Sequence, residues 1–364
     1  MNICIVAGAR PNFIKVAPIM RAIDKAKEQG KDVDCQLVYA GAGSDETLEQ
    51  SLFDDLQMRR PDVYLGVDCV SLNELTGRVM GEFEHYLENH PTDVVIVVDD
   101  LASTMAAAIV TKKQGIRLAH LVAGTRSFDI RMPKEINRLV IDGLSDLLFT
   151  AGEGASQIVS REGAQLSQVY MVGNILMDTL RANYARLRRP ALMDQLQLDD
   201  RSYLVFTLNR KALIADRDNL RLMLKAMLEA ADGTPVIAPL RGLARKAVAS
   251  LLATINMPLG SFHLTDPMGY LEFGYLTAHA KGIITDSGNV AEEATFNGVP
   301  CATLNSYTEH IETVRTGSNV LVGEDPQRLR ETVADMVAGK WKKCNIPDRW
   351  DGRSAERIVQ ILLG

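Results

Sequence analysis

The sequence of 364 residues has few cysteines and no close pair of them. Their number is odd, and they are Cys4, Cys35, Cys69, Cys301 and Cys344. No two of them form a CxxC motif, which argues against both a disulfide framework and a zinc site. Cys4 and Cys301 lie in strand-like apolar runs, where a buried thiol acts as a small hydrophobic group.

Long apolar runs and a basic leader are also missing. No run approaches the roughly 18–20 residues that span a bilayer. The first residues, MNICIVAGARPN, have no basic stretch before their apolar run, so they predict a first strand rather than a signal peptide. These absences predict a cytoplasmic protein without a membrane partner.

Positive charge is not in excess, because the formal net charge is −6. This argues against a nucleic-acid binder that relies on general positive charge. It still leaves room for a local basic pocket that binds a phosphate group.

Short runs rich in Val and Ile alternate with longer helical patterns through the first half of the chain. Strands are expected at 2–7, 35–40, 94–98, 116–121 and 147–150, and helices at 13–28, 47–56, 72–89 and 104–113. The runs NICIVA and VVIVV are apolar on both faces, as in parallel strands covered by helices on both sides. The βαβα order predicts a doubly wound α/β domain.

The same alternation restarts after a polar, basic stretch at 181–200. Strands are expected at 203–207, 234–238, 282–285 and 301–304, and helices at 219–231, 240–253, 270–279 and 289–296. We therefore expect two Rossmann-like α/β domains facing across a cleft. The first covers residues 1–172, the second covers 173–351, and a final helix within 352–364 packs back on the first. Such clefts are common ligand sites.

The first candidate site is the turn GARPNFIKVAP at residues 8–18. A strand ends there, Pro11 suits the first turn of a helix, and Arg10 and Lys15 lie near the helix N-terminus. Backbone N–H groups and two cations would favour an anion. The alternative is an ordinary strand-to-helix turn with solvated basic residues.

The second candidate site is TDSGNVAEEATFNGVP at residues 285–300. Ser287 is expected to cap the helix that follows, and Gly288 lets a ligand approach the backbone. Glu292 or Glu293 would then accept hydrogen bonds from a ribose diol, as in many nucleotide sites. The alternative is a well-capped helix with two solvated acids.

Two further segments carry carboxylates at the ends of apolar strands. Asp99 and Asp100 follow VVIVV, where partial desolvation is expected to raise a pKa. Ser103 or Thr104 is expected to cap the next helix, although an aspartate cap is the alternative. The stretch after His120 is densely charged, and it places Glu135 near a helix N-terminus, where capping would also select an acid.

Five segments, in chain order, resemble the non-hydrolysing UDP-N-acetylglucosamine 2-epimerases and together cover nearly the whole chain. They are GARPNFIKVAPI, HLVAGTRSFDIRMPKEINR, MVGNILMDTL, TDSGNVAEEA and YTEHIETVRTGSNVLVG. The resemblance implies a glycosyltransferase-B-like fold, a homodimer, and interconversion of UDP-GlcNAc and UDP-ManNAc without a metal or redox cofactor. It also implies elimination of UDP to a 2-acetamidoglucal, re-addition with inversion at C2, and a place in bacterial surface-polysaccharide precursor metabolism.

The sequence departs from the family pattern at several positions. Val122 stands where HVEAG has a glutamate, and Lys134 stands where PEEINR has its first glutamate. Asn209 replaces the histidine of TLHR, Leu240 replaces that of PVHPR, and His310 takes the place of the TERP arginine. The family's TGQHYD is AGAGSD here. Because several acid–base groups are replaced, ordinary epimerase turnover is expected to suffer.

Other family positions are kept. The resemblance assigns catalytic roles to Asp100 and Glu135. It assigns ligand contacts to Arg10, Lys15, Arg138, Asn209, Ser287, Gly288, Glu293 and His310. Three hypotheses follow. The first is an epimerase with Asp100 as the base, with Glu135 or His310 in a second role and with Lys134 near the phosphate. The second is a catalytically silent nucleotide-sugar binder or regulatory homologue, and the third is altered chemistry on another nucleotide sugar. The last has only the fold as its support.

Overall fold

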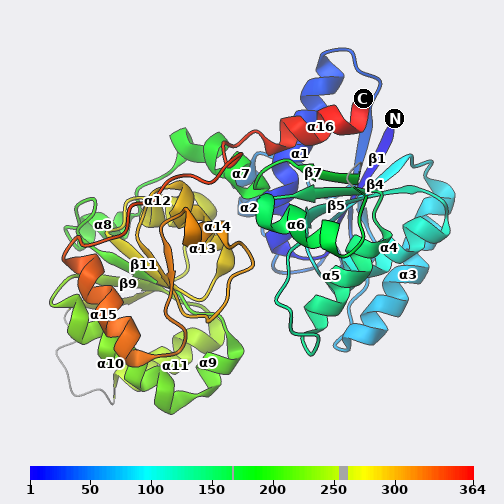
Figure 1. The fold of residues 1–364 in the computed structure, drawn as a ribbon. Coiled ribbons are helices and arrows are strands. Elements are labelled where there is room, and N and C mark those ends of the chain that lie inside the picture. The colour runs from blue at the N-terminus through cyan, green and yellow to red at the C-terminus, as the bar shows by residue number, and fades with distance from the viewer. Residues whose placement is uncertain (166–167, 254–260) are drawn as a thin grey trace. The chain divides into compact units, whose positions relative to one another are not determined.

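The structure is a computed structural model that describes residues 1–165, 168–253 and 261–364. Two compact units divide the chain. Unit 1 comprises Met1–Ala182 and Asp348–Gly364, and unit 2 comprises Asn183–Pro347. Each unit has a parallel sheet with helices on its faces (Figure 1), which confirms the predicted α/β class.

Unit 1 has a seven-stranded sheet in the order β3-β2-β1-β4-β5-β6-β7. The strands are β1 (Asn2–Ala7), β2 (Asp34–Tyr39), β3 (Val63–Tyr64), β4 (Val94–Val98), β5 (Arg117–Ala123), β6 (Leu147–Thr150) and β7 (Val169–Met171). The helices are α1 (Arg10–Glu28), α2 (Gln50–Leu56), α3 (Leu72–Asn89), α4 (Ala102–Lys113), α5 (Pro133–Leu144), α6 (Glu153–Arg161), α7 (Ile175–Asn183) and α16 (Ser354–Leu363). Helix α16, drawn in red, packs against α1 (Figure 1).

Unit 2 repeats this plan with a six-stranded sheet in the order β10-β9-β8-β11-β12-β13. The strands are β8 (Leu204–Phe206), β9 (Val236–Pro239), β10 (Phe262–Thr265), β11 (Gly282–Thr285), β12 (Cys301–Thr303) and β13 (Asn319–Leu321). A short 3-10 turn, η2 (Tyr184–Arg186), precedes the helices α8 (Ala191–Gln195), α9 (Lys211–Ala215), α10 (Arg217–Ala231), α11 (Gly242–Leu252), α12 (Tyr270–Ala278), α13 (Gly288–Phe296), α14 (Glu312–Arg315) and α15 (Pro326–Val337).

The apolar strands are buried as their composition predicts. Every residue of β4 is buried, as expected for a central parallel strand covered on both faces. Pro11 lies in the first turn of α1, as predicted, although the helix begins at Arg10 rather than at Phe13. Among the described residues, no helix is long and apolar enough to cross a membrane.

Each sheet has one topological switch point, which is the place where the strand order reverses direction. In unit 1 this point lies between β1 and β4, and in unit 2 between β8 and β11. The carboxyl edge at such a switch point is where open α/β sheets bind ligands. Each of four predicted site residues lies two or three residues after one of these strands: Arg10, Asp100, Asn209 and Gly288.

Candidate functional site

A carboxylate bridges the switch point of unit 1. Asp99, the first residue after β4, accepts hydrogen bonds from Asn12 Nδ2 at 2.8 Å and from Lys15 Nζ at 2.6 Å, both on α1. The sequence predicts that Lys15 meets a ligand anion, but in the structure its ammonium is buried against Asp99. Arg10, at the first position of α1, is half-buried.

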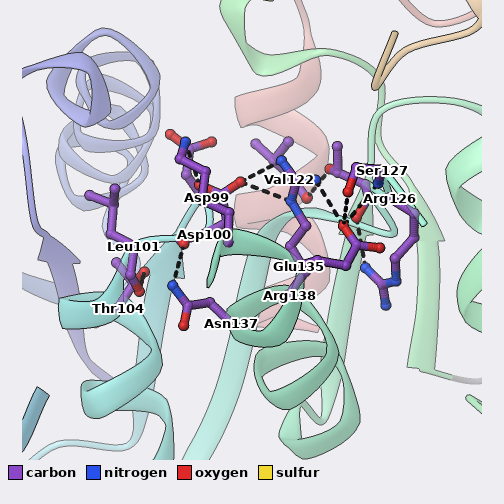
Figure 2. Close-up of polar contacts among 12 residues, drawn as sticks. Asp99, Asp100, Leu101, Thr104, Val122, Arg126, Ser127, Glu135, Asn137 and Arg138 are labelled. Atoms are coloured by element: carbon purple, nitrogen blue, oxygen red, sulfur yellow. Dashed lines mark hydrogen bonds and ion pairs between the residues drawn. The ribbon is translucent and has the colours of Figure 1, made fainter. Parts of the chain in front are cut away.

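Asp100 lies between two cations of α5. Arg138 donates from Nε to Oδ2 at 2.8 Å, and its Nη2 lies 2.6 Å from the same oxygen. Lys134 Nζ lies 3.1 Å from Oδ1. Asn137 Nδ2 also donates to the Asp100 carbonyl oxygen at 2.8 Å (Figure 2). Three side chains of α5, spaced three and four residues apart, therefore fix the loop after β4.

The expected raised pKa of Asp100 is wrong in direction. Burial alone would raise this pKa, but the charges and hydrogen bonds of Lys134 and Arg138 outweigh burial and lower it. The sequence-based prediction considered only burial at the end of the strand. Both cations that lower the pKa come from a helix more than thirty residues further along the chain. Asp100 is thus a stable carboxylate and, with both cations in place, a weak base.

Glu135 holds the loop before α5 in place. Its carboxylate accepts from Ser127 N and Oγ, both at 2.9 Å, from Phe128 N at 3.0 Å and from Arg138 Nη1 at 3.1 Å (Figure 2). Burial would raise the pKa of Glu135, but these hydrogen bonds outweigh it and lower the pKa. With both oxygens engaged, the geometry supports a positioning role for this residue.

A buried histidine of β5 contacts the backbone of the site. His120 Nδ1 lies 2.6 Å from Asp142 Oδ1, and Nε2 lies 3.0 Å from the Asp99 carbonyl oxygen. Both contacts are to oxygen atoms, so the ring connects the Asp142 carboxylate to the backbone of Asp99. Arg126 pairs with Asp142 at 2.7 Å and also with Glu162. Sequence reasoning missed this network, because the partners are separated along the chain.

Val122 occupies a strained position beside these groups. Its φ is 72°, which is unfavourable for a β-branched residue. The pairing of β5 with β6 shifts register between Leu121 and Ala123, so Val122 is at a bulge. Bulges next to sites re-aim side chains. The bulge therefore sets the direction of the side chain at position 122, and the valine side chain there cannot exchange a proton.

The expected cap of α4 is also wrong. Leu101 is the N-cap residue and has no side-chain capping bond. Thr104 Oγ1 instead donates to the Leu101 carbonyl oxygen at 2.8 Å, and Ser103 lies inside the helix. Neither hydroxyl therefore caps the helix.

Unit 2 has a similar carboxylate bridge at its own switch point. Asp286 Oδ2 accepts from the backbone N–H groups of Asn209 at 2.7 Å and Arg210 at 2.5 Å. The side chain of Asn209 is exposed, as is Gly288 across the switch point. A Cβ built on Gly288 would have one neighbour within 4 Å, Glu292 Oε1 at 3.9 Å, among the described residues. The backbone at Gly288 is thus open to a ligand.

Ser287 does not cap α13 as predicted. It is the N-cap residue, but it has no side-chain capping hydrogen bond. Its N–H donates to Thr285 Oγ1 at 3.0 Å. The helix begins at Gly288, and both of its glutamates lie beyond the first turn. The N–H groups of the first turn consequently have no side-chain cap at Ser287.

Two glutamates of α13 are buried rather than solvated. Glu292 is 6% exposed and Glu293 is 7% exposed. Burial, together with the neighbouring Glu292, raises the pKa of Glu293 to about 8. His310 Nε2 lies 3.5 Å from Glu292 Oε1, so His310 faces this acidic pair. Glu293 is therefore largely a neutral acid at pH 7, able to donate a hydrogen bond as well as accept one.

No group of three or more His, Cys, Asp or Glu side chains within residues 1–165, 168–253 and 261–364 is arranged to hold a metal ion.

The chain matches the profile of the family described as UDP-N-acetylglucosamine 2-epimerase over residues 25–363. The UDP-N-acetylglucosamine 2-epimerase of Methanocaldococcus jannaschii is 32% identical over 371 residues, covering 100% of this chain and 99% of that protein. The UDP-2,3-diacetamido-2,3-dideoxy-D-glucuronate 2-epimerase of Pseudomonas aeruginosa is 31% identical over 365 residues, with 100% and 99% covered.

A solved structure of full length gives the same result. The crystal structure of the M. jannaschii UDP-GlcNAc 2-epimerase in complex with UDP-GlcNAc and UDP superposes with a TM-score of 0.84 at 32% identity, covering 100% of this chain and 99% of the other. The prediction of two Rossmann-like domains of the glycosyltransferase-B-like type is thereby confirmed. The chain belongs to the UDP-N-acetylglucosamine 2-epimerase family.

Proposed function

We propose that this protein binds UDP-N-acetylglucosamine and inverts its configuration at C2, with Asp100 as the base. The observation that carries the proposal is Asp100 at the carboxyl end of β4, flanked by Arg138 and Lys134, in a chain of this family. The base takes the C2 proton, the C–H electron pair forms the C1–C2 double bond, and the C1–O pair leaves with UDP. In the return step a solvent-derived proton adds to C2 on the opposite face, the double-bond pair forms the new C2–H bond, and a diphosphate oxygen of UDP re-forms the C1–O bond, which gives UDP-ManNAc.

In unit 2 the proposed nucleotide contacts are the exposed backbone at Gly288 and the side chains of Ser287, Asn209, Glu293 and His310. A neutral Glu293 can both donate to and accept from a ribose hydroxyl. In unit 1, Arg10, Lys15 and Arg138 are proposed to face the ligand's anionic part. Lys15 must share its charge with Asp99 to do so.

Oligomeric state and compartment are part of the same proposal. The family resemblance supports a homodimer. All five cysteines are free thiols, and Cys4, Cys35 and Cys301 are buried, which supports a reducing compartment such as the cytoplasm.

A second function, the catalytically silent binder, is suggested by the arrangement of three residues. The paired Asp100, the engaged Glu135 and the aliphatic Val122 together describe a site that binds a nucleotide sugar without turning it over. The full-length similarity to 2-epimerases supports the first function, inversion at C2, instead.

Incubation with UDP-GlcNAc in D₂O separates the two. An epimerase incorporates deuterium at C2 and forms UDP-ManNAc, and Asp100→Asn lowers this rate on the order of 10²–10⁴-fold, while the surface control Asp129→Asn leaves it unchanged. Calorimetric binding of UDP without any deuterium at C2 would establish the silent binder. The absence of both binding and exchange would refute the proposed function.

A further inference from the structure

The two oxygens of Asp100 have partners of different kinds. Oδ2 is held by Arg138 through two guanidinium nitrogens, at 2.8 and 2.6 Å. Oδ1 is paired with Lys134 Nζ at 3.1 Å. Arg138 thus holds one oxygen of the Asp100 carboxylate, and Lys134 pairs with the other.

The two cations differ in how firmly they are fixed. The Arg138 side chain is 2% exposed and also bonds Glu135. The Lys134 side chain is 55% exposed, at the second position of α5. Exposed lysine pairs are weak, and the ammonium has a flexible four-carbon stem. Lys134 can therefore exchange partners without disturbing the fold, while Arg138 cannot.

We propose that Lys134 is a positioning residue, an exchangeable counterion that covers Asp100 Oδ1 in the free protein and moves to the diphosphate of a bound ligand, which uncovers that oxygen to receive the C2 proton. This inference rests on the proposed function. It gives a physical role to the lysine that replaces a family glutamate.

Movement of the Lys134 ammonium from Asp100 to the diphosphate would couple ligand binding to the basicity of Asp100. The charged and titratable groups around Asp100 are its neighbour Asp99, Lys15 from α1, His120 from β5, and Lys134, Glu135 and Arg138 from α5. Lys15 pairs with Asp99, and His120 is buried against Asp142. Lys134 is therefore the exposed member of this group, and its departure makes Asp100 a stronger base only when a diphosphate is present.

The test is a carbon-13 NMR titration of the Asp100 carboxyl, assigned through Asp100→Asn, with and without UDP. Without UDP, Lys134→Met should raise the Asp100 midpoint by about one pH unit. Lys134→Arg keeps the charge and should titrate like the wild type. UDP should raise the Asp100 midpoint in both proteins, because its negative charge repels the carboxylate in both. The rise should be clearly larger in the wild type, because only the wild type also loses the Lys134 ammonium from Asp100.

The outcomes separate this inference from the proposed function. An equal UDP-induced rise in the wild type and Lys134→Met, with UDP bound to both, overturns the role of Lys134 alone. Lys134→Met with an unchanged midpoint in the absence of UDP does the same. A wild-type protein with no UDP-induced shift at any resonance overturns the proposed function and this inference together.

Discussion

Arg138 and Asp100 form a buried ion pair in which Arg138 Nη2 lies 2.6 Å from Asp100 Oδ2. The same guanidinium donates through Nη1 to Glu135 at 3.1 Å. One cation therefore compensates two carboxylates, one after β4 and one in the first turn of α5 (Figure 2). This links the loop after β4 to the loop before α5 through a single side chain.

Replacement of Arg138 by Met should destabilise the protein strongly. The change leaves Asp100 and Glu135 buried without their shared counterion, which typically costs roughly 3–5 kcal/mol of unfolding free energy. The matched control Lys134→Met removes an exposed partner of the same Asp100 and should cost less than about 1 kcal/mol. Urea denaturation measures both, and similar losses for the two variants would contradict this account.

Gly124 should tolerate no side chain. Its φ is +78°, and a Cβ there would lie 2.3 Å from the Ala155 carbonyl oxygen, a backbone atom that cannot move aside cheaply. Gly124→Ala is therefore expected to lower the unfolding free energy by roughly 2 kcal/mol or more. Gly143, in α5, has no neighbour within 4 Å of such a Cβ among the described residues. Gly143→Ala is the control and should be neutral or slightly stabilising in thermal unfolding.

The sequence predicted the central elements well, because their patterns are unambiguous. The bounds of β4 and α3 agree with prediction to the residue, and α16 lies within the expected range 352–364. VVIVV is apolar on both faces, and α3 has an apolar stripe at helical spacing. The short edge strands β3, β7, β10 and β13 were not predicted, since two to four residues carry too little periodicity to be distinguished from loops.

The sequence singled out candidate site residues, but it did not predict which of them contact one another. Asp100 and Arg138 were both identified, yet their pairing joins positions 38 apart in the sequence. The predicted direction of the Asp100 pKa failed for that reason. The left-handed backbone at Val122 had no signal either, because valine disfavours that conformation. Strain of this kind is held by the surrounding structure rather than chosen by the local sequence.

Glu293 should make unfolding free energy depend on pH. Its folded pKa of about 8 exceeds the ordinary glutamate value of 4.5, so the folded state binds more protons than the unfolded state between these values. Stability is then fully present below pH 4.5 and is lost as pH rises toward 8, by up to about 1.4 kcal/mol per unit. Glu293→Gln removes this contribution. Its unfolding free energy should fall less than that of the wild type between pH 5 and 8.

The control for this pH series is Glu331→Gln, which replaces an exposed glutamate of α15. It should follow the wild-type curve, because an exposed side chain gains little from being neutral. Urea midpoints at four or five pH values suffice for the comparison. Parallel curves for the wild type and Glu293→Gln would show that Glu293 is ionised in the folded protein at neutral pH.

Restoring the two missing acids should raise the rate of C2 exchange. Glutamate is better tolerated than the β-branched Val122 at a φ of 72°, so Val122→Glu should not harm the fold. Lys134→Glu replaces the cation beside Asp100 Oδ1 with a like charge, which raises the pKa of Asp100. One well-placed acid–base group contributes on the order of 10²–10⁴-fold.

We therefore expect the double variant Val122→Glu/Lys134→Glu to incorporate deuterium at C2 of UDP-GlcNAc at least roughly tenfold faster than the wild type at saturating substrate. The KM should rise, because the lysine no longer meets the diphosphate. Val122→Gln/Lys134→Gln has the same side-chain lengths without acid–base groups and should show no gain. A gain of the same size in the glutamine variant would mean that shape or polarity, rather than proton transfer, limits the natural site.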